Sequence, residues 1–167
     1  MDEILTWKKD LIWANQFLPE IKRILGFYLI VEAPEIDDSE MNTDLIVLKL
    51  DAIRIAVRIR KHLYLEKYKN EFTIRSNRKN NLTEFAKIIK GYGNYFFYGF
   101  ANREESMLAF WRLLDLNEFR LSYMSQLYLG KHLEQKRSNK DGSSDFFVFN
   151  VNDFPDRLSI ATSDPNC

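Results

Sequence analysis

The sequence predicts a mixed α/β fold in which strands occur in two blocks and helices pack against them. The first observation is the segment 53–60, where apolar side chains alternate with Arg54, Arg58 and Arg60, as in a strand with one buried face. The second is the recurrence of apolar residues at helical spacing over 3–25. The third is composition, because 167 residues that are 46% hydrophobic and 14% aromatic can bury the core of one domain.

The first half of the chain is predicted to form a helix followed by three strands. The helix covers 3–25, Pro19 breaks or kinks it, and Gly26 caps its end. Apolar runs predict strands at 27–33, 43–50 and 53–60. Because Asp51 and Ala52 leave room only for a short turn, the last two strands are expected to form an antiparallel hairpin.

The second half is predicted to alternate further strands and helices. Apolar patterning predicts strands at 72–75, 95–100, 108–116 and 146–151, and helices at 82–90 and 117–129. Asn81 or Thr83 can cap the first of these helices, and Gly91 and Gly93 end it. Gly130 ends the second helix.

The expected organisation is one domain over 1–155, followed by a C-terminal tail over 156–167. The polar segment 131–144 is predicted to be a mobile loop. The single cysteine, Cys167, excludes an internal disulfide and a Cys-rich zinc site, as expected in a reducing cytoplasm. Because no apolar run reaches membrane-spanning length and the N-terminus lacks a basic leader, we expect a cytoplasmic protein with no membrane partner.

Charge is distributed unevenly along a chain whose formal net charge is zero. Residues 32–44 contain six acidic residues and no basic residue, whereas residues 49–90 contain twelve basic and four acidic residues, a net charge of +8. A basic surface within a neutral chain is the usual electrostatic signature of nucleic-acid binding.

The order of predicted elements resembles the restriction-endonuclease-like, PD-(D/E)xK nuclease superfamily over residues 4–116. Asp44, at the start of the second strand, matches the first acidic position of that family's motif. Arg58-Ile59-Arg60 stands where the family has an acid, one residue and a lysine, so the motif is degenerate. The resemblance implies a mixed sheet flanked by helices, with a C-terminal helix-strand extension after it.

The resemblance also implies a metal-dependent phosphodiester nuclease whose site has moved, because Arg58 would repel a cation. The relocated catalytic residues would be Asp44, Glu84 and Lys87, and Asp44 and Glu84 would bind Mg²⁺ or Mn²⁺. Glu84 and Lys87 lie three residues apart and share a helix face. The alternative is an ordinary exposed helix pair and a protein that needs no cofactor.

The expected nucleic-acid-binding residues continue from the arginine strand into the next segment. They are Arg54, Arg58, Arg60, Lys61, Lys67, Arg75, Arg78 and Lys79. Arginine presents a planar fork that fits phosphate oxygens, and we expect DNA rather than RNA as the ligand. Alternatively, these arginines pair with the acidic segment 32–44.

Five tyrosines lie near these bases in the sequence and could stack nucleobases: Tyr64, Tyr68, Tyr92, Tyr95 and Tyr98. The favoured interpretation is that they edge the core, with Tyr92 and Tyr95 the first candidates for stacking. The first function class is a nucleic-acid-binding protein of nuclease ancestry, of a size that would suit a phage or mobile-element accessory protein. A second function class is a catalytically inactive protein-binding module or inhibitor of a nuclease or defence component.

Overall fold

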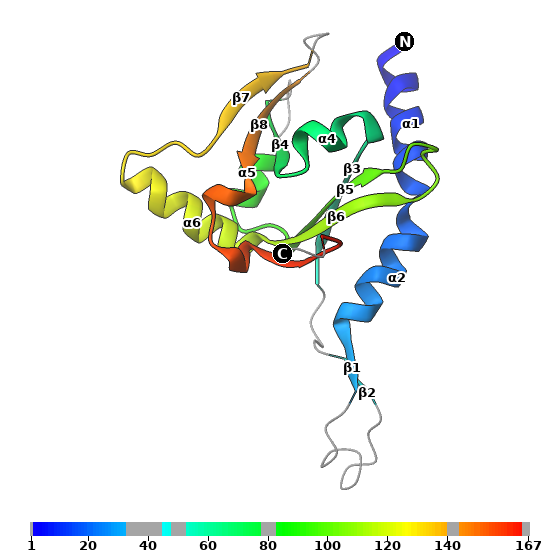
Figure 1. The fold of residues 1–167 in the computed structure, drawn as a ribbon. Coiled ribbons are helices and arrows are strands. Elements are labelled where there is room, and N and C mark those ends of the chain that lie inside the picture. Colours follow the sequence, from blue (N-terminus) through cyan, green and yellow to red (C-terminus); the bar gives the residue numbers. More distant parts are fainter. Residues whose placement is uncertain (1, 33–44, 48–52, 78–82, 140–143, 165–167) are drawn as a thin grey trace, which may run out of the picture.

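The computed structural model describes residues 2–32, 45–47, 53–77, 83–139 and 144–164, which form a mixed α/β fold (Figure 1). Within these residues a four-stranded sheet has the order β3-β5-β6-β9, in which β3 and β5 are parallel and the other pairs antiparallel. Its strands are β3 (Ile55–Arg60), β5 (Tyr95–Ala101), β6 (Leu108–Asp115) and β9 (Ser159–Thr162). The prediction of a mixed sheet flanked by helices is therefore confirmed as a mixed α/β architecture.

A second, antiparallel sheet has the order β4-β8-β7. Its strands are β4 (Glu71–Asn77), β8 (Asp145–Asn150) and β7 (Gln135–Ser138). A separate antiparallel pair, β1 (Ile30–Glu32) with β2 (Leu45–Val47), lies at the end of the second helix (Figure 1).

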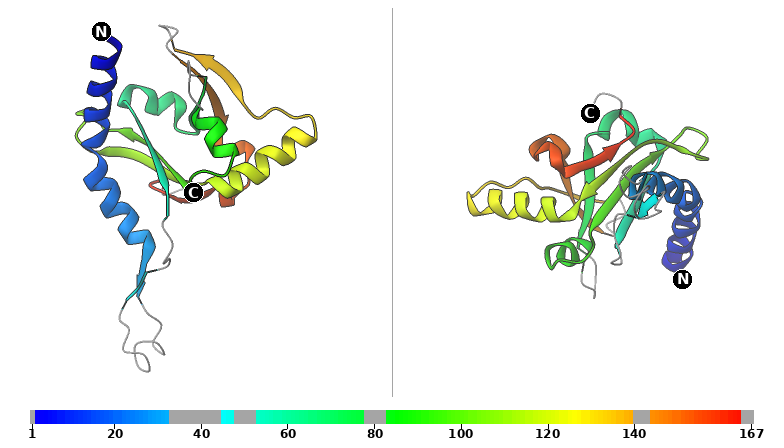
Figure 2. Two further views of the ribbon diagram at one scale, coloured as in Figure 1. Left: turned by 180° about the vertical axis from the view of Figure 1, so that it is seen from behind. Right: turned by 90° about the horizontal axis from the view of Figure 1, so that it is seen from below.

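The helices lie on both sides of the four-stranded sheet (Figure 2). They are α1 (Asp2–Asn15), α2 (Leu18–Leu29), α4 (Leu65–Tyr68), α5 (Glu84–Ile89) and α6 (Leu116–Tyr128), with short 3-10 helices η1 (His62–Tyr64), η2 (Val151–Asp153) and η3 (Asp156–Leu158). Among the described residues, no helix combines the length and the apolar character needed to cross a bilayer.

Strand β5 lies inside the four-stranded sheet and is buried on both faces, which explains why it is almost wholly aromatic. Phe97 points into a core shared with α2, where Phe17, Ile21 and Ile24 are buried. The neighbouring side chains Phe96, Tyr98 and Phe100 point to the opposite face, into a core shared with the second sheet, α5 and α6. Successive side chains of β5 thus point to opposite faces of the sheet, as in any strand, but both faces are apolar.

The same alternation orients the arginines of β3. Ile55 and Ile59 pack into the core beneath α2, whereas Ala56 packs into the core toward the second sheet. Arg58 and Arg60 share the face of Ala56, so they point toward β4 and β8 and are only half-exposed. Two of the three arginines in the segment 53–60 are therefore partly covered by protein.

Several sequence predictions of element boundaries and pairing are wrong. The break that Pro19 was expected to cause in the helix over 3–25 is, however, confirmed, since the chain forms two helices separated at Gln16 and Phe17, with Pro19 in the first turn of α2, where its missing N–H is tolerated. Gly26 lies inside α2, which takes up the first part of the strand predicted over 27–33.

The predicted hairpin between 43–50 and 53–60 is also wrong in its pairing. β2 pairs with β1, and β3 pairs in parallel with β5, after a crossover that contains β4 and α5. Two further strands, each of four residues, were missed because neither carries an apolar run long enough to predict a strand. The predicted mobile loop 131–144 contains β7, and the predicted tail 156–167 contains β9, which pairs with β6.

Helix α6 is capped by the side chain of Asp115, and the buried Glu118 in its first turn links it to Arg157 by a hydrogen bond. Asp115 Oδ1 accepts hydrogen bonds from the backbone N–H groups of Asn117 and Glu118. Glu118 Oε2 accepts from Arg157 Nε at 2.6 Å and its Oε1 accepts from Ser122 Oγ at 2.7 Å. These bonds, that of Arg157 first, lower the pKa of Glu118 below its ordinary value.

We expect this carboxylate to make folding stability pH-dependent. Because its pKa is lower in the folded than in the unfolded chain, its contribution is complete above the ordinary pKa of 4.5 and is lost as pH falls through the folded pKa. Urea unfolding should show a difference between the wild type and Glu118→Gln that is present at neutral pH and becomes smaller as the pH is lowered below 4.5. A difference that does not change with pH would contradict this.

Candidate functional site

Three of the eight residues expected to bind nucleic acid, Arg54, Arg58 and Arg75, line a cavity of about 710 Å³ between β3, β4, α5 and the loop after α5. Its charged lining residues are Arg54, Arg58, Arg75, Lys87 and Glu84. Arg54 and Lys87 are exposed, whereas Arg58, Arg75 and Glu84 are half-buried. Four cationic side chains with one carboxylate make this cavity electropositive.

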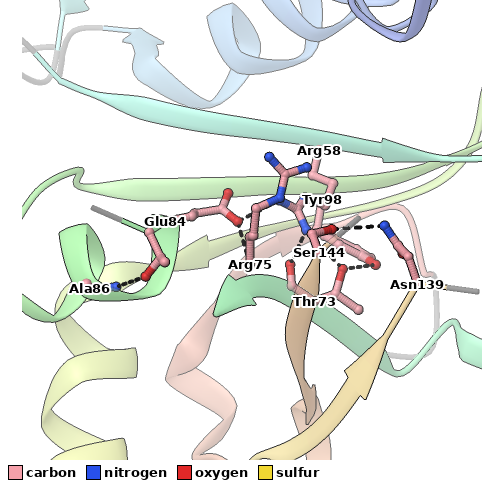
Figure 3. A network of polar contacts seen from close by, with 9 residues as sticks. Arg58, Thr73, Arg75, Glu84, Ala86, Tyr98, Asn139 and Ser144 are labelled. Carbon is pink, nitrogen blue, oxygen red and sulfur yellow. Dashed lines mark hydrogen bonds and ion pairs between the residues drawn. The ribbon is translucent and has the colours of Figure 1, made fainter. Parts of the chain in front are cut away.

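Glu84 is placed by the start of α5. Thr83 has extended backbone geometry, and its Oγ1 accepts a hydrogen bond from Ala86 N at 3.2 Å, which caps the helix as the sequence predicted. The next residue, Glu84, thus projects toward β3 and β4 (Figure 3). Its Oε2 accepts from Arg58 Nη2 at 2.6 Å and from the backbone N–H of Arg75 at 2.9 Å.

Arg58 is held on its other side by β4. Its Nη1 lies 3.1 Å from Thr73 O and 3.3 Å from Thr73 Oγ1, and donates to both (Figure 3). Thr73 Oγ1 in turn lies 3.3 Å from the hydroxyl of Tyr98. Burial, above all, raises the pKa of Tyr98, so this hydroxyl is protonated at neutral pH.

The structure brings together five of the residues singled out from the sequence and separates others. Arg60 turns away from the cavity, and its guanidinium lies 4.7 Å from the ring centre of Tyr64. Lys61 Nζ lies 3.8 Å from Glu105 Oε1, and Lys67 Nζ lies 5.3 Å from the ring centre of Tyr68. The remaining predicted site residues, Asp44, Arg78 and Lys79, lie outside the described residues.

Two residues of the polar network were not predicted as site residues. Thr73 sits in the middle of a strand that reads as buried, and it is 7% exposed. Tyr98 was interpreted as an edge of the core, yet its hydroxyl continues the network that begins at Glu84. Because both act through cross-sheet contacts, no local spacing in the sequence could have identified them.

The donor set around Glu84 does not suit a divalent cation. Mg²⁺ and Mn²⁺ need several oxygen ligands, and within the part of the chain that the structure describes Glu84 is the one carboxylate that lines the cavity. Its Oε2 is already engaged by two N–H donors, and no cluster of three acidic, histidine or cysteine residues occurs in the described part of the chain. The metal site at Asp44 and Glu84, and catalysis by these residues with Lys87, stay predictions.

The alternative pairing of the arginines with the acidic segment also stays a prediction. Residues 33–44 lie outside the described residues. The partner that the structure gives to Arg58 is Glu84, on α5.

Comparison of the chain with known family models, with curated proteins and with solved structures found no match. The functional argument therefore depends on the geometry of the cavity.

Proposed function

We propose that this protein binds nucleic acid through its phosphate backbone, at the cavity between β3, β4 and α5. The observation that carries the proposal is the convergence of Arg54, Arg58, Arg75 and Lys87, from separate segments, on one cavity. Among the described residues, the acidic side chain that lines it is Glu84, which forms an ion pair with Arg58. An anion that enters this cavity therefore meets a net positive charge.

The arrangement of these cations suits the oxygens of phosphate groups. Arginine donates in a planar fork that matches two phosphate oxygens, and such contacts contribute affinity without reading sequence. Arg58 is already held by Glu84 and Thr73, so it loses little side-chain freedom when an anion binds. The exposed Arg54 and Lys87 at the mouth can attract a polyanion from solution.

Binding, rather than cleavage, is the activity that the described residues support. A nuclease ancestry and a preference for DNA over RNA remain part of the hypothesis that began with the family resemblance. If the strand is also cut, that chemistry needs ligands beyond Glu84, because one engaged carboxylate cannot hold the metal ion that such hydrolysis uses. Incubation of bound oligonucleotides with Mg²⁺ or Mn²⁺ measures whether cleavage occurs.

We expect Arg54→Glu with Lys87→Glu to weaken oligonucleotide binding at least about tenfold at low salt, because two phosphate contacts become repulsive. The dependence of log affinity on log salt concentration should become shallower by about 2. The measurement is fluorescence anisotropy of a labelled DNA or RNA strand titrated with the full chain.

The matched control is Lys90→Glu with Lys131→Glu, which changes net charge equally. Both lysines are exposed and neither lines the cavity. This control should bind nearly as the wild type does. An equal loss in both double variants would show that only overall charge matters, and unchanged binding in the first would refute the proposed site.

A further inference from the structure

A second, smaller cavity of about 220 Å³ lies beside the first, between η1, α4, β5 and the second sheet. Aromatic side chains form much of its wall: Tyr64, Tyr68, Tyr98, Phe100 and Phe146. The volume is below the range of about 300–1,000 Å³ that is usual for drug-sized ligands. Aromatic walls around so small a space suit one planar ring system.

Polar groups at this cavity can bind the edge of such a ring. Arg137 lies over the Tyr68 ring at 5.6 Å, and its Nη1 lies 3.3 Å from Glu71 Oε2. Arg60 also lines the cavity, and within the described residues its guanidinium has an aromatic neighbour but forms no ion pair. Guanidinium planes stack on nucleobases. Ser138 Oγ also lines the cavity and donates to Asp145 Oδ1 at 2.7 Å, so its oxygen can still accept a hydrogen bond from a base.

The two cavities share a wall. Arg58 lines the first cavity, and it donates to Thr73, which lines the second together with its neighbour Tyr98. Arg58 and Arg60 follow each other on one face of β3, so their Cα atoms are separated by about 6.6 Å. Because the linings of the two cavities meet at the contact between Arg58 and Thr73, a single strand bound in the first cavity can extend to the second.

We propose that the second cavity takes one unpaired nucleobase of the strand whose phosphates bind in the first. This inference rests on the proposed function and specifies its substrate class: single-stranded or locally unpaired nucleic acid. A base pair is too large for the cavity and its rings are covered by stacked neighbours, whereas an unpaired base exposes its ring face and its hydrogen-bonding edge.

The test compares three labelled ligands of equal length with the full-length wild-type chain: a single strand, the same strand made abasic throughout, and a duplex. The abasic strand keeps the phosphates and loses the bases. We expect the intact strand to bind about tenfold or more tightly than the abasic strand, and more tightly than the duplex at matched salt. Equal affinity for intact and abasic strands would overturn the inference.

A pair of variants locates the effect. Tyr64→Leu with Tyr68→Leu should remove most of the preference for the intact strand but leave abasic-strand affinity unchanged. The control is Tyr128→Leu, because Tyr128 is 92% exposed on α6 and lines neither cavity. If the preference survives the double variant, the base does not bind in this cavity.

Failure of the inference is distinguishable from failure of the proposed function. If intact and abasic strands bind equally and both lose affinity in the Arg54→Glu, Lys87→Glu variant, the phosphate site stands and the base site is refuted. If the wild type binds none of the three ligands, both are refuted. The comparison of ligands on the wild type does not depend on any variant folding.

Discussion

Replacement of Phe149 by alanine is expected to lower the free energy of unfolding by about 3–5 kcal/mol. Phe149 is fully buried in β8, and its ring lies 5.3 Å from that of Phe72, 5.0 Å from that of Phe119 and 5.9 Å from that of Tyr123. Its removal leaves a cavity where the second sheet meets α6, and these rings cannot all move to fill it. Urea unfolding followed by far-ultraviolet circular dichroism measures the change.

Tyr128→Ala is the matched control, since it also removes an aromatic ring but from a position that is 92% exposed. Its effect on unfolding should remain within about 0.5 kcal/mol. A loss of less than about 1 kcal/mol in Phe149→Ala would mean that the second sheet is not packed on α6 as described.

This packing matters for the site because the second sheet supplies one of its walls. Phe149 is the register partner of Phe72 on β4, and the next residue of that strand, Thr73, accepts the hydrogen bonds of Arg58. We therefore expect Phe149→Ala to weaken oligonucleotide binding as well, through a less rigid arginine.

Sequence patterning predicted the helices and strands that contain a run of buried apolar residues. It missed the short strands that form only because they pair with a strand elsewhere in the sequence. The aromatic run of β5, the apolar runs of β6 and β8 and the capped helix α5 each carry a strong local signal, and each is present. β7 is Gln-Lys-Arg-Ser, with no apolar residue, and it is a strand because its backbone pairs with β8. No period in the sequence encodes that pairing.

The same limit applies to the site. The alternation over β3 indicated that its arginines share a face, and this is how Arg58 and Arg60 lie. It could not indicate that β4 would cover that face, because β4 joins a different sheet. Arg58 is consequently half-buried and forms hydrogen bonds with both Thr73 and Glu84. Arg54 precedes the strand and is exposed.

Substitution of Glu84 in the Arg58–Glu84 pair is expected to change the free energy of unfolding and the oligonucleotide affinity in opposite directions. Glu84→Gln removes the negative charge of the cavity but keeps an oxygen that can accept from the backbone N–H of Arg75. We expect stability to fall by about 1 kcal/mol and oligonucleotide affinity to rise about fivefold, because an acid no longer opposes the phosphate. The measurements are urea unfolding and anisotropy titration on the same protein samples.

Arg58→Met should lower both quantities. It removes the charge-assisted bond to Glu84 and the bonds to Thr73, in a pair whose side chains are 21% and 26% exposed, so we expect a loss of about 2–3 kcal/mol in stability. Affinity should fall about tenfold or more with the loss of a phosphate contact. Methionine keeps most of the side-chain volume, so the loss reflects charge and hydrogen bonding.

The double variant Arg58→Met, Glu84→Gln distinguishes the energy of the ion pair from the energies of the other contacts that each residue makes. If the ion pair is what Glu84 contributes, the double variant should lose less stability than the sum of the two single variants, since neither charge is left without its partner. Its affinity should lie between those of the two single variants. If Glu84→Gln instead weakens binding, the repulsion between Glu84 and phosphate is outweighed, either by its role in holding Arg58 in place or by a direct contact with the ligand such as a metal ligand would make.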